Sequence, residues 1–171
     1  MERLDLDEAI KTAEEFVNSD YGKKDDTKPK SSDPSDFEKF KSFVNQGNLA
    51  IKQSNGKLYL LAEAWLYLAH IKGLIPSVKT RSFKMEDDDE NEIVGVEAIC
   101  ELKDAKTNEV VSTSVMVASS DESFLQDKPL YAVYGMAETR AISRAVRNVY
   151  GYIAKGAGFE STPASEVDLE R

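Results

Sequence analysis

The sequence predicts an α+β fold in which a β-hairpin, a helix and a three-stranded antiparallel sheet pack on a long C-terminal helix. Three observations predict it: apolar residues at helical spacing over 131–158, an Asn-Gly pair between two short apolar runs, and three successive segments of strand character over 77–118. Strands that follow one another before a closing helix, without strict alternation of strand and helix, are typical of this class.

Four segments are expected along the 171 residues. Residues 1–20 are predicted to hold a short helix, with Asp5 and Glu8 as a capping box. Residues 21–36 form a polar, proline-containing linker. Residues 37–160 make up a single α+β domain, and residues 161–171 form a tail or a short helix that begins at Thr162-Pro163.

The domain is expected to open with a helix that starts at Asp33-Pro34 and ends at Gly47. One face of this helix carries Phe37, Phe40, Phe43 and Val44. The hairpin follows, and its Asn55-Gly56 pair predicts a type I′ turn, in which both central residues have positive φ. A helix over about 62–72 comes next, with Gly73 after its last residue.

The three strands are expected over 77–85, 93–102 and 109–118. Alternation places Lys79, Arg81 and Phe83 on one side of the first. The acidic run 86–90 between the first two strands is interpreted as a solvated hairpin tip, with a divalent cation site as the alternative.

The long helix over 131–158 carries its positive charge on one side. Arg140, Arg144, Arg147 and Lys155 fall within an arc of roughly 80° at about 100° per residue, opposite an apolar side rich in alanine. A solvated face is one interpretation. A basic surface that binds phosphate is the other, because acids do not alternate with these arginines along the helix.

Composition limits the function. The net charge of −9 and pI near 4.8 argue against a protein that coats nucleic acid everywhere, but they allow a local basic groove. Cys100 is the only cysteine, so a reducing compartment is expected. The N-terminus is charged and no apolar run approaches about 20 residues, so we expect an intracellular, cytoplasmic protein with no membrane partner.

Catalytic motifs are sparse. The sequence has no phosphate-binding loop of the NTPase type and no zinc-ligand spacing, so no catalytic residue, cofactor or metal is expected. One weak enzymatic pattern is Glu101-Leu-Lys103, which has the E-x-K form found in metal-dependent nucleases.

The segment Met136–Gly151 resembles the helix of the single-strand-annealing recombinase superfamily, which includes phage Erf and Red-beta type proteins and their eukaryotic Rad counterpart. The features that carry the resemblance are Ala137, Thr139, Ala141, Arg144-Ala145-Val146-Arg147 and Tyr150-Gly151. The order of elements over about 49–167 is also similar to that of small phage and archaeal proteins with a TRAxxRA helix.

The resemblance implies ATP-independent binding of single-stranded DNA, strand annealing in phage or archaeal recombination or replication, and assembly into rings or filaments. For a phage protein it also implies synthesis in an infected host cell. The DNA would lie in a groove between the sheet and the long helix. Its expected phosphate contacts are Arg140, Arg144, Arg147 and Lys155 on one wall and Lys79, Arg81, Lys52 and Lys57 on the other. Tyr131 and Tyr134 are candidates for base stacking, and packing against the sheet is the alternative for each.

Two other functions stay open. The first is an oligomeric interaction module without DNA binding, which contacts a replication or recombination protein and whose arginines pair with acids of a neighbouring subunit. The second is a Mg²⁺-dependent nuclease that uses Glu101.

Overall fold

The computed structural model describes residues 34–86 and 92–167. The predicted N-terminal helix, the linker up to residue 33 and the acids 87–90 lie outside the described residues. The elements, in chain order, are α2 (Pro34–Gly47), β1 (Ala50–Lys52), β2 (Leu58–Leu60), α3 (Ala62–Ile71), β3 (Leu74–Glu86), β4 (Glu92–Asp104), β5 (Val110–Ser119), α4 (Leu130–Gly156) and the 3₁₀ turn η2 (Ala164–Glu166).

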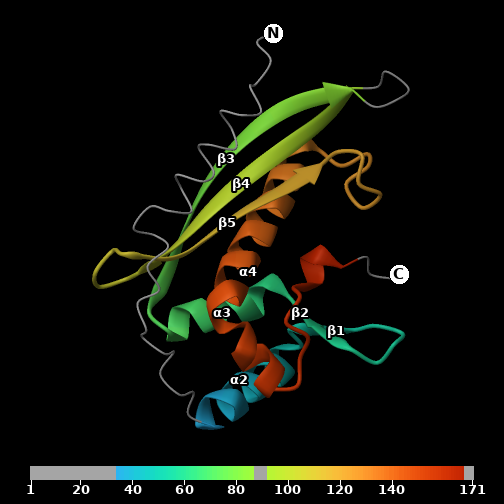
Figure 1. The fold of residues 1–171 in the computed structure, drawn as a ribbon. Helices are drawn as coiled ribbons and strands as arrows, with labels where there is room; N and C mark the ends of the chain where they lie inside the picture. The colour runs from blue at the N-terminus through green and yellow to red at the C-terminus, as the bar shows by residue number, and fades with distance from the viewer. Residues whose placement is uncertain (1–33, 87–91, 168–171) are drawn as a thin grey trace, which may run out of the picture. The chain divides into compact units, whose positions relative to one another are not determined.

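The predicted α+β class is confirmed. β1 and β2 form an antiparallel hairpin, and β3, β4 and β5 form an antiparallel sheet with β4 in the centre. The long helix α4 packs against one face of that sheet (Figure 1). Among the described residues, no helix is long and apolar enough to cross a membrane.

Alanines bring α4 close to the sheet. Ala137, Ala141 and Ala145 are fully buried, as is Val146 beside them. Small side chains allow the helix backbone to approach the strands, and the Ser114 hydroxyl of β5 donates a hydrogen bond of 2.5 Å to the Ala141 carbonyl. This buried contact fixes which face of the sheet meets the helix.

The register of the three strands shows which residues of the whole sheet face α4. Ser114 lies opposite Cys100, and Cys100 lies opposite Val78. Directly paired residues point to the same face of a sheet, so all three face α4. Their neighbours in sequence point to the other face, which we call the open face. Its residues include Ile75, Lys79, Arg81, Phe83, Glu97, Ile99, Glu101, Lys103, Val115 and Val117.

The hairpin turn differs from the predicted type I′ geometry. Only Gly56 has positive φ, at 80°, and Asn55 does not. The Gly56 amide donates to the Gln53 carbonyl at 2.9 Å, and the Asn55 side chain accepts from the Lys57 amide at 2.9 Å. The loop is therefore longer by a residue, with glycine in the left-handed position after the turn, a common alternative to the two-residue loop.

The two ends of the domain extend beyond the predicted 37–160. Helix α2 starts at Pro34, so the expected linker runs three residues too far. After α4 the chain turns back and crosses beside it as a segment that we call the strap, residues 160–167. The strap contains η2 and buries Pro163 and Ala164. The short C-terminal helix predicted after Thr162-Pro163 is this single 3₁₀ turn.

Candidate nucleic-acid interface

The predicted basic side of α4 lies beside the strap and the edge strand β5. We call Arg140, Arg144 and Arg147 the arginine flank. Each of the three side chains contacts a carboxylate from elsewhere in the chain. The sequence therefore places the arginines together correctly, but their acidic partners come from distant segments.

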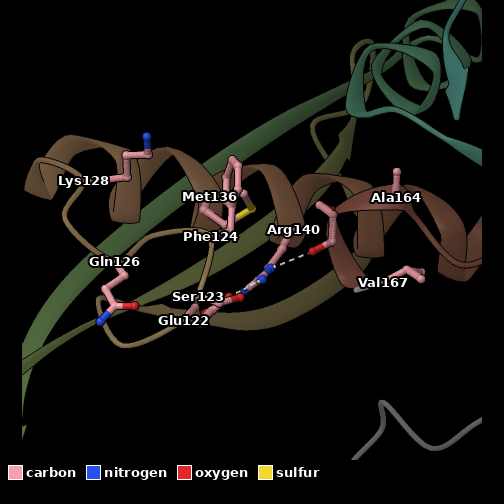
Figure 2. Close-up of a pocket in the computed structure, with 10 residues that line it drawn as sticks. Glu122, Ser123, Phe124, Gln126, Lys128, Met136, Arg140, Ala164 and Val167 are labelled. Atoms are coloured by element: carbon pink, nitrogen blue, oxygen red, sulfur yellow. Dashed lines mark hydrogen bonds and ion pairs between the residues drawn. The ribbon is translucent and has the colours of Figure 1, made fainter. Parts of the chain in front are cut away.

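Arg140 links three segments of the fold through its guanidinium group. Its guanidinium donates to both Glu122 carboxylate oxygens, at 2.7 and 2.5 Å, and to the carbonyls of Ser165 and Val117, at 2.9 and 3.0 Å. Its side chain is 17% exposed. These contacts tie together the loop 120–129, β5 and the strap, and Figure 2 shows the Arg140 side chain directed at Glu122. Arg140 therefore has little capacity left for an external phosphate, contrary to its expected role as a phosphate contact.

The contact with Arg140 also shifts the pKa of the Glu122 carboxyl. Burial raises its pKa, but hydrogen bonds from the Arg140 guanidinium and the Ser119 amide lower it, and the net result is a lowered pKa. The Ser119 amide donates to the Glu122 carboxylate at 3.0 Å. Glu122 is therefore held in its charged form by contacts that exist only in the folded chain.

Arg144 and Arg147 share one carboxylate. Arg144 donates from Nε to Glu166 Oε1 at 2.9 Å and from Nη2 to Oε2, and Arg147 lies 3.4 Å from Oε2. Glu166 is 7% exposed, whereas the arginine side chains are 34% and 29% exposed. Two guanidinium groups around one carboxylate leave a local charge of +1 at a partly exposed position. Such a fork is the geometry with which arginine binds oxyanions, including phosphate.

Three other predicted site residues lie on α4. Lys155 in its last turn is exposed. Tyr131 in the first turn is 77% exposed, which leaves its ring accessible for stacking. Tyr134 is partly buried and packs against the core, which agrees with the alternative to base stacking given for this residue.

Lys79 and Arg81 do not form the opposite wall of a groove with the arginine flank. They lie on the open face of the sheet, opposite Ile99 and Glu97, whereas α4 covers the other face. Arg81 pairs with Glu97 at 2.8 Å. The predicted two-walled groove between sheet and helix is thus wrong, because the core fills that space with side chains such as Val96, Leu102 and Val146.

The hairpin lysines lie nearer to the strap. The Glu160 amide at the start of the strap donates to the Leu58 carbonyl of β2 at 2.8 Å. Lys57 pairs with the Glu160 carboxylate at 3.3 Å, and Lys52 is exposed. The strap therefore connects the hairpin to the arginine flank, although Lys57 already has an acidic partner.

The E-x-K residues lie on the open face. Glu101 and Lys103 form an ion pair of 2.9 Å with each other, and the hydrogen bond from Lys103 lowers the pKa of Glu101. Within 34–86 and 92–167, no group of three or more histidine, cysteine or acidic side chains is placed to hold a metal ion.

A cleft beside Arg140 was not predicted. It has a volume of about 660 Å³ and lies between the loop 120–129, α4 and the strap (Figure 2). A second hollow of about 330 Å³ lies next to it, and Arg140 and Ser165 line both. No local sequence pattern marks the cleft, because its walls come from three segments that meet only in the folded chain.

A scan against protein-family models and a search of curated proteins gave no match to this chain.

Proposed function

We propose that the protein binds single-stranded DNA through Arg144 and Arg147 and promotes annealing of complementary strands without ATP. The observation that carries the proposal is the fork that these two arginines form around the Glu166 carboxylate. In this proposal a backbone phosphate takes the place of the carboxylate between the two guanidinium groups, so Glu166 competes with the strand for them.

The proposed chemistry suits annealing. Contacts to phosphate hold a strand without reading its sequence, and they leave base edges free to pair. Binding of this kind needs no catalytic group. The resemblance of Met136–Gly151 to annealing proteins adds support, since the same helix carries the fork.

Two measurements test the proposal. Fluorescence anisotropy with a labelled single-stranded oligonucleotide and a duplex control is expected to show salt-sensitive binding that prefers the single strand. Pairing of two labelled complementary strands is expected to be faster with the protein than without it, in the absence of nucleotide. Lack of binding to single-stranded DNA even at low salt refutes the proposal.

A second candidate function is an oligomeric interaction module, and the open face favours it. Apolar side chains there are unusually exposed: Ile75 at 57%, Val115 at 54% and Val117 at 44%. A second copy of the chain is the proposed occupant, as in a ring or filament. Because the flank arginines pair with acids of their own chain, we assign the contact between copies to this apolar face instead.

Light scattering tests this candidate. We expect an oligomer in the wild type and a smaller species in Val115→Lys, and the module without DNA binding also predicts that the wild type leaves single-stranded DNA unbound at low salt. A monomeric wild type at high protein concentration contradicts the module.

A further inference from the structure

The cleft beside Arg140 combines apolar and polar groups in a volume that suits a small ligand. Clefts of about 300–1,000 Å³ are typical of ligand sites in proteins, and this one is about 660 Å³. Its lining includes Phe124, Gln126, Lys128, Met136, Arg140 and Ser165. The ring of Phe124 lies beside Met136 in this lining (Figure 2).

Phe124 is held in an exposed position by its neighbours. Its side chain is 44% exposed, whereas Leu125 is 1% exposed and anchors the loop in the core. The Leu125 and Gln126 amides donate to the Glu122 carbonyl at 2.7 and 2.8 Å, and Arg140 fixes the Glu122 side chain. The loop is therefore ordered around an aromatic ring that faces the cleft instead of the core.

The groups in the cleft match the parts of a nucleotide. A ring face and a thioether offer an apolar surface for a flat base, and the Gln126 amide offers both a donor and an acceptor for a base edge. The Lys128 ammonium, which has no ion-pair partner within the part of the chain that the structure describes, offers a contact for phosphate.

Continuity with the arginine fork favours nucleic acid over a protein partner. Arg140 and Ser165 line both the cleft and the adjacent hollow, and Arg144 and Glu166 line that hollow. The cleft and the hollow beside the fork therefore adjoin each other at the contact between Arg140 and Ser165, which places a base site next to a phosphate site.

We propose that this cleft binds one unstacked nucleobase of single-stranded DNA, with Phe124 as the stacking surface. The inference rests on the proposed function, because the fork must hold the strand that supplies the base. It assigns the preference for single strands to a defined site, since a base in a duplex is not free to enter it.

The test compares two oligonucleotides of equal length and charge, one of thymidines and one of abasic sites. Wild-type protein is expected to bind the thymidine oligonucleotide about tenfold more tightly, as one stacked base would produce. Phe124→Ala is expected to remove this difference and to leave the affinity for the abasic oligonucleotide unchanged. Tyr152→Ala, which removes a 38% exposed ring outside the cleft lining, is the matched control and should keep the difference.

The outcomes separate this inference from the proposed function. Tight, salt-sensitive binding of both oligonucleotides with equal affinity overturns the base site and leaves the fork in place. A preference that survives in Phe124→Ala, or that disappears in Tyr152→Ala, also overturns it and leaves the cleft open to a protein ligand. Absence of binding by either oligonucleotide at low salt refutes the proposed function itself.

Discussion

Glu166→Gln is expected to weaken the fold and to strengthen DNA binding. The change removes the negative charge that Arg144 and Arg147 share while keeping the shape of the side chain. The local charge of the fork then rises from +1 to +2. A residue that only stabilises the fold would lower both stability and binding, so the opposite signs identify an internal competitor for phosphate.

The magnitude follows from the exposure of the pair. A charge-assisted hydrogen bond contributes about 1.5–3 kcal/mol in a buried site. Because the Arg144 and Arg147 side chains are 34% and 29% exposed, solvent screening reduces this to about 1 kcal/mol. We therefore expect a loss of about 1 kcal/mol in the free energy of unfolding and a gain in affinity of about five- to tenfold.

Titration of a labelled single strand at several salt concentrations measures the effect. One additional phosphate contact is expected to steepen the salt slope by about 0.7. Glu138→Gln is the matched control, because it removes the same charge from an exposed position on the side of α4 opposite to Arg147, about 180° away around the helix axis. Equal gains in affinity in the two variants, or reduced affinity in folded Glu166→Gln, would show that Glu166 does not compete with phosphate for the arginines.

Four further predictions concern other parts of the molecule. Arg140→Ala should lower the free energy of unfolding by roughly 2–3 kcal/mol in chemical denaturation, because it leaves Glu122 and two carbonyls without their donor. Because the folded-state pKa of Glu122 is lowered, its ion pair with Arg140 stabilises the fold above the unfolded pKa near 4.5, and this stabilisation should be lost as pH falls further. Chemical denaturation of Glu122→Gln should not show that loss. Burial raises the pKa of the Cys100 thiol to about 11, so an aromatic disulfide reagent at neutral pH should react only as fast as the protein unfolds. Lys79→Ala with Arg81→Ala should leave the affinity for single-stranded DNA within about twofold, because both residues lie on the open face.

The elements were predictable because their signals are local. Helical spacing places Ala137, Ala141 and Ala145 on one side of α4 and the arginines on another, and the buried alanines follow that prediction. Alternation likewise predicts that Lys79 and Arg81 share one face of β3.

The face that meets the helix was not predictable for β3, because this strand is polar on both sides. Thr80 and Ser82 alternate with Lys79 and Arg81, so no hydrophobic pattern specifies the buried side. The assignment comes instead from β4, whose Ala98 and Cys100 are fully buried, and from the register between the strands.

The acidic partners of the arginine flank could not be predicted from the sequence either. Glu122 lies 18 residues before Arg140, and Glu166 lies 22 residues after Arg144. Helix periodicity reports charges only three or four residues apart, so it indicated an unpaired basic surface. The loop and the strap bring these acids to the helix through tertiary packing, and the same packing creates the cleft around Phe124.

The most direct test of the central claim is the salt dependence of single-stranded DNA binding by the Arg144→Ala, Arg147→Ala double variant and the wild type. Phosphate binding at the fork predicts that the double variant folds, binds at least tenfold more weakly at low salt, and has a salt slope shallower by about 1.4, which corresponds to two lost phosphate contacts. Equal affinities and equal slopes in two folded proteins would contradict it and would place any DNA binding elsewhere on the molecule.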